Sequence, residues 1–268
     1  MSDIAALQFD TLLLDVSDSA VALVTLNRPE VRNALNTAMM TELRDQFQQL
    51  YIDSAQLRAV IVTGAGDKAF CAGGDLKQRN SMTDQQWQQQ HAVLEQAIEA
   101  IIACPIPVIA AVNGDCMGGG LEIALCCDFI YASDNARFAL PEGKLGIMPG
   151  GCGTQNLTRA VGERRAKELI MTGRLFDAVR AKEWQLVNEI VSQDSLLDTV
   201  MAVALEISRL GPLSVTQIKK SVSVAAQTDL KTGYAFELAA YNRLIPTEDR
   251  IEGIAAFNEK RKPEFKGR

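Results

Sequence analysis

The sequence predicts an α/β fold, with strands and helices alternating through the first half of the chain. Short apolar runs rich in β-branched residues occupy residues 21–26, 58–63 and 107–112, and each ends at a turn signal. Between them, residues 37–50 and 84–103 have the apolar spacing of amphipathic helices. The 268 residues are 47% hydrophobic and 22% charged, which is an ordinary globular balance for one large domain or two small ones.

Local patterns place the elements of this first half. The strand at 21–26 stops at the turn sequence NRPE, the strand at 58–63 at GAGD, and the strand at 107–112 at NGD. A helix at 120–127 opens directly after a glycine run, and a short strand follows at 129–132. Because helices of this length separate the strands, we expect parallel pairing with right-handed crossovers. The large apolar residues with helical spacing in 37–50 are Met39, Met40, Leu43, Phe47 and Leu50.

From about residue 153 onward the pattern is mainly helical. A helix predicted at 159–172 ends at Gly173, and the dipeptide Gly211-Pro212 reads as a break between later helices. No fixed-period repeat or low-complexity linker separates the two halves. We therefore expect an α/β body followed by a helical region. The other helices predicted here lie at 178–185, 195–210, 229–243 and 248–260.

Composition excludes several classes of function. With 27 Lys and Arg against 33 Asp and Glu, the chain lacks the positive field of a nucleic-acid reader. The single histidine, His91, excludes zinc sites with two histidine ligands, and no Gly-x-Ser-x-Gly elbow accompanies it. The six cysteines form no Cys-x-x-Cys pair and read as reduced, mostly structural thiols. With no signal peptide and no apolar run near 20 residues, we expect a cytoplasmic protein without membrane association.

Two glycine-rich turns are candidates for ligand contact. The first lies in residues 69–77, AFCAGGDLK, where Gly73 and Gly74 let main-chain N–H groups approach a ligand. The second lies in residues 113–122, NGDCMGGGLE, where three glycines open a helix. A helix start presents unpaired N–H groups that can hold an oxyanion or a phosphate. Neither segment is a P-loop or a Rossmann fingerprint, and each alone can equally be a structural turn.

Two glutamates accompany these turns. Glu122 falls in the first turn of the predicted helix at 120–127, and Glu142 follows a proline in the apolar segment FALPEGKLGIMPGGCG. A carboxylate in an apolar pocket has a raised pKa and can act as an acid or base near neutral pH. Taken together, two amide donors and two carboxylates indicate chemistry that polarises a carbonyl and moves protons on neighbouring carbons. No metal set is indicated.

The ordered motifs resemble one known family over nearly the whole chain. These are LNRPEVRNAL, AFCAGGDLK, PVIAAVNGDCMGGGLEIALCCD, FALPEGKLGIMPGGCGTQNLTRAVG and the C-terminal DRIEGIAAFNEKRKPEFKGR. In this order and spacing they resemble the enoyl-CoA hydratase/isomerase (crotonase) superfamily. The resemblance implies a β-β-α spiral core over residues 1–200 and a C-terminal helical trimerisation region over 201–268. It also implies a homotrimer or homohexamer.

The resemblance assigns roles to individual positions. Gly74 and Gly119 match the two amides of an oxyanion hole, and Glu122 and Glu142 match the catalytic glutamates. Gly150 matches a residue that helps to position water. Lys260 is a candidate contact for the nucleotide end of CoA, from the same or a neighbouring subunit. The positions that match CoA and acyl-thioester contacts are Ala34, Ala72, Gly73, Gly74, Asp75, Leu76, Lys77 and Gly119.

The implied activity is reversible syn hydration of a 2-enoyl-CoA to a 3-hydroxyacyl-CoA, with CoA as part of the substrate and no separate cofactor. Alternatives are a double-bond isomerase, a carnitinyl-CoA dehydratase-like lyase, and an acyl-CoA-binding protein without turnover. A Cys152 nucleophile is a further alternative, though no histidine is predicted beside it. The sequence departs from common hydratases at Gly74, where alanine is frequent, at Asp115, where an aromatic residue is common, and at Cys152.

Overall fold

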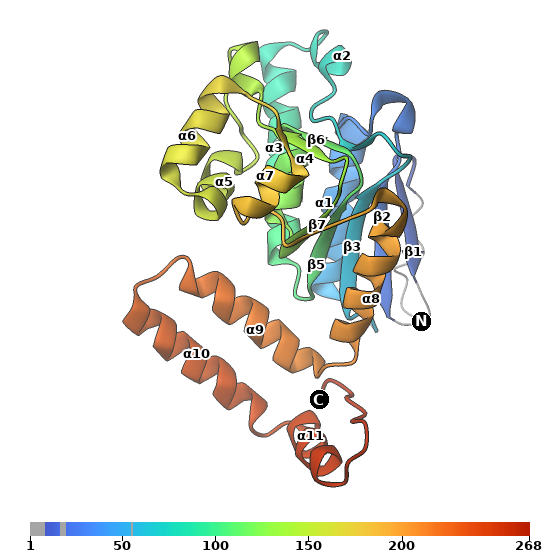
Figure 1. The fold of residues 1–268 in the computed structure, drawn as a ribbon, viewed down its shortest axis with the longest axis vertical. Coiled ribbons are helices and arrows are strands. Elements are labelled where there is room, and N and C mark those ends of the chain that lie inside the picture. Colours follow the sequence, from blue (N-terminus) through green and yellow to red (C-terminus); the bar gives the residue numbers. More distant parts are fainter. Residues whose placement is uncertain (1–8, 17–19, 55) are drawn as a thin grey trace.

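The computed structural model describes residues 9–16, 20–54 and 56–268, and two β-sheets form its body (Figure 1). The larger sheet has six strands in the order β1-β2-β3-β5-β7-β10. All of its pairings are parallel except that of β1 with β2. Its strands are β1 (Leu12–Val16), β2 (Val21–Leu26), β3 (Ala59–Gly64), β5 (Val108–Val112), β7 (Phe129–Ser133) and β10 (Glu189–Val191).

The smaller sheet has four short strands in the order β4-β6-β8-β9. The central strands β3, β5 and β7 each lead, after a tight connection, into a strand of this second sheet, and a helix follows. This repeated order is the predicted β-β-α spiral, which the structure confirms. The strands are β4 (Ala69–Cys71), β6 (Asp115–Met117), β8 (Arg137–Ala139) and β9 (Phe176–Asp177).

The large sheet is buried on both faces, as its continuous apolar strands require. Along β3, Val60 and Val62 join the main core beneath α1 and α3, whereas Ile61 on the opposite face packs with Val200 of α8. Successive side chains of a strand point to opposite faces, so one strand supplies both cores. Figure 1 shows α8 lying along the strands on this second face. The helices named here are α1 (Thr37–Ile52), α3 (Asp84–Ala103) and α8 (Leu196–Ser208).

The remaining helices cover one end of the body or extend from it. The short helices α2 (Leu76–Arg79) and α4 (Gly119–Cys126) follow the turns after β4 and β6, and a 3-10 turn spans Glu142–Leu145. The helices α9 and α10 run side by side below the sheets, and α11 lies near the start of α9, at the end opposite the α9–α10 turn (Figure 1). The later helices are α5 (Gly153–Val161), α6 (Glu163–Thr172), α7 (Ala178–Glu183), α9 (Pro212–Ala225), α10 (Leu230–Leu244) and α11 (Glu248–Asn258).

Two sequence predictions for the second half were wrong. The single helix predicted at 159–172 is two helices, α5 and α6, because Gly162 adopts φ 82° between them. The helix α9 was not predicted, because Gly211-Pro212 was interpreted as a break. In the structure Pro212 is the first residue of α9, a position that has no acceptor for a backbone N–H and therefore suits proline.

The predicted division at residue 200 falls inside α8, which packs on the large sheet. The two-part division and the trimerisation role of the C-terminal helices stay predictions. Within the described part of the chain, no helix is long and apolar enough to cross a membrane.

Candidate active site

A cleft of about 900 Å³ lies at the end of the body where the turns after β4 and β6 meet. Its walls come mainly from four segments: the β4–α2 turn with α2, the start of α4, one face of α3 and the segment from Pro141 to Gly150. Leu35 and Met40 also line it. Both predicted glycine turns and both predicted glutamates therefore border one cavity. Near its mouth, Leu145, Ile147 and Met148 are exposed and give this wall an apolar surface.

Two main-chain amides are available to a ligand in this cleft. Gly74 lies in the β4–α2 turn, and Gly119 is the first residue of α4. A β-carbon built on Gly119 would lie 3.9 Å from the Gly74 nitrogen, so the two segments are close neighbours. Leu35 fixes the first turn by donating to the Gly73 carbonyl at 2.8 Å and accepting from the Asp75 N–H at 2.9 Å. Across residues 9–16, 20–54 and 56–268, neither the Gly74 nor the Gly119 N–H has a hydrogen-bond acceptor.

The close approach of these turns requires glycine at two positions. Gly73 has φ 91°, and a β-carbon there would fall 2.9 Å from the Met117 carbonyl oxygen. Gly118 has φ 51° and ψ −125°, and a β-carbon there would fall 2.8 Å from Oε1 of Glu142. Other residues rarely adopt such backbone angles, so both turns depend on glycine.

Glu122 is held rigidly at the floor of the cleft. Its side chain, 3% exposed, projects from the first turn of α4. Its Oε1 accepts hydrogen bonds from the backbone N–H groups of Gly151 at 2.6 Å and Gly153 at 3.0 Å. Burial raises the pKa of this carboxyl, while the two backbone hydrogen bonds oppose that rise. The carboxylate is thus fixed in one orientation and poised as a proton acceptor.

Glu142 is held by fewer hydrogen bonds than Glu122. It begins the 3-10 turn Glu142–Leu145 and borders the same cleft. Its Oε2 is buried and has no hydrogen-bond partner among the described residues. Burial raises the pKa of Glu142 to about 7, and the charge of Glu122 acts in the same direction. A carboxyl group of this pKa exchanges protons readily near neutral pH.

The structure places only some of the other predicted contact residues in the cleft. Ala72 and Leu76 line it beside Gly73 and Gly74. Ala34 is buried beneath it, with its carbonyl accepting from Arg28, and exposed Lys77 is not in its lining. Lys260 follows α11, outside the cleft of its own chain.

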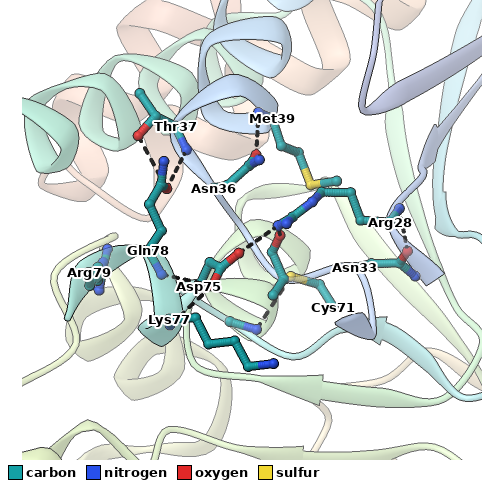
Figure 2. A network of polar contacts seen from close by, with 12 residues as sticks. Arg28, Asn33, Asn36, Thr37, Met39, Cys71, Asp75, Lys77, Gln78 and Arg79 are labelled. Atoms are coloured by element: carbon teal, nitrogen blue, oxygen red, sulfur yellow. Dashed lines mark hydrogen bonds and ion pairs between the residues drawn. The ribbon is translucent and has the colours of Figure 1, made fainter. Parts of the chain in front are cut away.

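Asp75 has a structural task in the first turn. Its carboxylate accepts from the backbone N–H groups of Lys77 and Gln78 and caps α2. The same carboxylate pairs with Arg28 at 2.9 Å, as Figure 2 shows. Burial raises the pKa of Asp75, but these hydrogen bonds and the Arg28 charge together hold it below the usual value.

Several residues of the cleft were missed by the sequence analysis. His91 faces Gly150, because a β-carbon built on Gly150 would fall 2.5 Å from Cε1 of the His91 ring. Nε2 of the same ring lies 3.2 Å from Oε1 of Glu95. Arg79, at the end of α2, also lines the cleft. The glycines in MPGGCG were the available signal for the Glu122 anchor, since two of them, Gly151 and Gly153, supply its N–H donors. The position of Arg79 depends on contacts between α2 and α3, and that of His91 on contacts between α3 and Gly150; no motif indicated either.

Two of the three departures from common hydratases, Asp115 and Cys152, differ in location. Asp115 lies in β6, away from the cleft, and binds Arg137 of the neighbouring strand through two hydrogen bonds of 2.8 and 2.9 Å. Cys152 is exposed, with φ 67° at the start of α5. Partial desolvation and the nearby glutamates raise the pKa of its thiol, which disfavours the thiolate that a nucleophile needs. In the described ranges, no cluster of three or more His, Cys, Asp or Glu side chains is arranged to hold a metal.

Comparison with known proteins matches the chain to one family. Residues 17–268 match the family model described as enoyl-CoA hydratase/isomerase. A putative enoyl-CoA hydratase/isomerase of Bacillus subtilis is 43% identical over 96% of this chain and 99% of its own length. A probable mitochondrial enoyl-CoA hydratase of Arabidopsis thaliana is 40% identical over 95% of this chain and 84% of its own.

Solved structures agree with these relatives. The crystal structure of enoyl-CoA hydratase from Bacillus anthracis superposes with a TM-score of 0.94, at 42% identity, over 97% of this chain and all of that chain. The Pseudomonas aeruginosa protein DspI superposes with a TM-score of 0.93, at 31% identity, over 98% of this chain and 99% of that chain.

Proposed function

The chain belongs to the enoyl-CoA hydratase/isomerase family, and from that premise we propose that it hydrates a 2-enoyl-CoA reversibly. Water adds in syn fashion across the double bond, and the product is a 3-hydroxyacyl-CoA. The single observation that carries the proposal is that Glu122 and Glu142 border one cleft together with two main-chain amides that have no protein acceptor in the described residues.

The two amides supply the oxyanion hole of this mechanism. The thioester carbonyl oxygen accepts hydrogen bonds from the N–H groups of Gly74 and Gly119. As water adds at C3, the π electrons move toward that oxygen, and negative charge develops on it. Donors aimed at developing charge bind the enolate-like intermediate more tightly than the substrate, and one such donor lowers the barrier by about 3 kcal/mol.

The two glutamates divide the proton transfers. Glu122, oriented by two backbone N–H groups, takes a proton from water as the water oxygen bonds to C3. Glu142, with a pKa of about 7, gives its proton to C2. One proton is lost and one is gained by the protein, and exchange between the two carboxyls restores the starting state. General acid–base steps of this kind contribute about 10²- to 10⁴-fold each.

The carboxylate pair favours hydration over isomerisation. An isomerase moves one proton from C4 to C2 or back and adds no water, so a single carboxylate suffices. Here two carboxylates border the same cavity, and both have pKa values raised by burial. The cleft thus has one group for each proton that hydration moves.

The substrate's CoA part extends away from this pair. We propose that the turn from Ala72 to Lys77, with Ala34 beneath it, contacts the pantetheine arm, and that Lys260 meets the nucleotide end from a neighbouring copy of the chain. CoA enters as part of the substrate, and no separate cofactor takes part. The exposed apolar wall at Leu145, Ile147 and Met148 suits the acyl chain.

The assay that tests this function compares crotonyl-CoA with a 3-enoyl-CoA of similar length. We expect rapid loss of the conjugated thioester of crotonyl-CoA and formation of 3-hydroxybutyryl-CoA. Conversion of the 3-enoyl-CoA without hydration of crotonyl-CoA would identify an isomerase instead. Binding of both thioesters without turnover would identify an acyl-CoA-binding protein.

A further inference from the structure

A guanidinium group without a carboxylate partner lies in the cleft. Arg79 is the last residue of α2, is half-buried, and lines the cavity that the two glutamates also border. Its Nε donates to Oε1 of Gln90 at 2.9 Å, and its Cζ lies 4.8 Å from the centre of the Trp87 ring. In residues 9–16, 20–54 and 56–268, no carboxylate pairs with it, and its two terminal nitrogens have no hydrogen-bond acceptor.

Neighbouring side chains hold this guanidinium in a fixed position. Gln90 of α3 is 3% exposed, and its Nε2 donates to Oγ1 of Thr37 at 2.8 Å and to Oε1 of Gln78 at 2.9 Å. These bonds leave Oε1 of Gln90 facing Arg79. Figure 2 shows Gln78 reaching up to Thr37 from the same short helix that carries Arg79. A buried side chain, held by two hydrogen bonds from its Nε2, therefore orients the Arg79 head, and the Trp87 ring covers one face of it.

The guanidinium lies close to the reacting atoms. A β-carbon built on Gly74 would fall 2.9 Å from Cζ of Arg79, so the cation lies against the turn that carries one oxyanion amide. Glu122 and Glu142 lie farther away: both attract the Arg79 charge, yet neither comes within ion-pair distance of it. The unpaired cation thus lies beside one proposed oxyanion amide, in the same cleft as the two acids, where the proposed function places the acyl group.

We propose that Arg79 binds a carboxylate on the acyl group, so that the substrate is a 2-enoyl-CoA that carries a free carboxylate close to its double bond. This inference rests on the hydratase function and narrows its substrate class. A guanidinium and a carboxylate match through two parallel hydrogen bonds, which here use the two nitrogens that the protein leaves free. A plain alkyl chain in the same place leaves a half-buried cation with only water as its partner.

The test compares two thioesters of equal chain length. Glutaconyl-CoA carries a terminal carboxylate where 2-pentenoyl-CoA has a methyl group, and both are 2-enoyl-CoAs. We expect the wild type to have a kcat/KM for glutaconyl-CoA about 10-fold or more above that for 2-pentenoyl-CoA. Arg79→Gln should lower this ratio by about 30-fold or more, and Arg79→Lys by less, because a lysine keeps the charge without the paired donors.

The controls separate the possible causes of a change in the ratio of the two kcat/KM values. Arg174→Gln removes an exposed guanidinium that pairs with Glu168 outside the cleft, and it should leave the ratio unchanged. Thermal unfolding checks that Arg79→Gln is folded. If Arg79→Gln slows both thioesters by the same factor, Arg79 acts on the glutamates and the inference is wrong. A wild type that hydrates 2-pentenoyl-CoA but not glutaconyl-CoA overturns the inference alone, whereas hydration of neither overturns the proposed function as well.

Discussion

Oε1 of Glu122 accepts the backbone N–H of Gly151 at 2.6 Å, across 29 positions of sequence. With the N–H of Gly153, this contact ties the first turn of α4 to the start of α5. The glycines are spaced so that both amides reach one oxygen, and Cys152 between them takes a left-handed conformation. The orientation of the proposed base therefore depends on the main chain of the loop that leads into α5.

We predict that Gly153→Ala lowers kcat about 10- to 100-fold with little change in KM, because the new β-carbon falls 2.8 Å from Oε1 of Glu122 and displaces the carboxylate. Steady-state kinetics on crotonyl-CoA measure this. Gly233→Ala in α10 is the matched control, since its nearest neighbour lies 3.7 Å away. In a Glu122→Gln background, Gly153→Ala should add no further loss. A full additional loss there would show that Gly153 acts on something other than Glu122.

Glu142 should make stability depend on pH. Its pKa is raised to about 7 in the folded protein, against about 4.3 in an unfolded chain. A raised carboxyl pKa means that folding favours the protonated form. The stability it contributes is complete below about pH 4 and is lost as pH rises through 7.

We expect Glu142→Gln to raise the free energy of unfolding by about 1 kcal/mol at pH 8, because a neutral amide replaces a buried carboxylate oxygen that lacks a partner. The difference should vanish near pH 4, where wild-type Glu142 is protonated. Denaturant unfolding at the two pH values measures it. Equal stability of the two proteins at pH 8 would show that the carboxylate is well solvated in the folded state.

The long elements were predictable because each carries its own pattern. Helix α3 was predicted at 84–103 and forms there, with Thr83 and Gln86 making a capping box. The strands of the small sheet, such as Asp115–Met117, have three residues or fewer and are too short to show an alternation. Three of the four, β4, β6 and β8, directly follow a long parallel strand that positions them, whereas β9 follows α6 and pairs with β8. This information lies in the fold and not in the segment.

The residues of the site also fall into those that the sequence predicted and those that it did not. Gly74, Gly119, Glu122 and Glu142 belong to recognisable motifs, and the structure brings all four to one cleft. Arg79 was missed because only the packing of α2 against α3 turns its side chain inward, through Gln90. Such placements depend on contacts between distant segments, for which one sequence gives no periodic signal.

The C-terminal helices should mediate assembly. Large apolar side chains are exposed along α10 and α11, and Phe257, the most exposed of them, is 83% accessible. Monomers rarely expose so many apolar side chains on adjoining helices. We expect light scattering to give three or six times the mass of one chain, and Phe257→Asp to lower that mass. Met171→Asp, an exposed position on α6, is the control and should not. A monomeric wild type would contradict this assignment.

The hydration rate of crotonyl-CoA in single Glu122→Gln and Glu142→Gln variants tests the central claim most directly. Glu168→Gln, which changes an exposed glutamate paired with Arg174, is the matched control. The account predicts that each cleft variant, folded as judged by thermal unfolding, loses about 100-fold or more of wild-type kcat, while the control keeps it. If both cleft variants hydrate crotonyl-CoA at near the wild-type rate, the two carboxylates do not carry the reaction and the account is wrong.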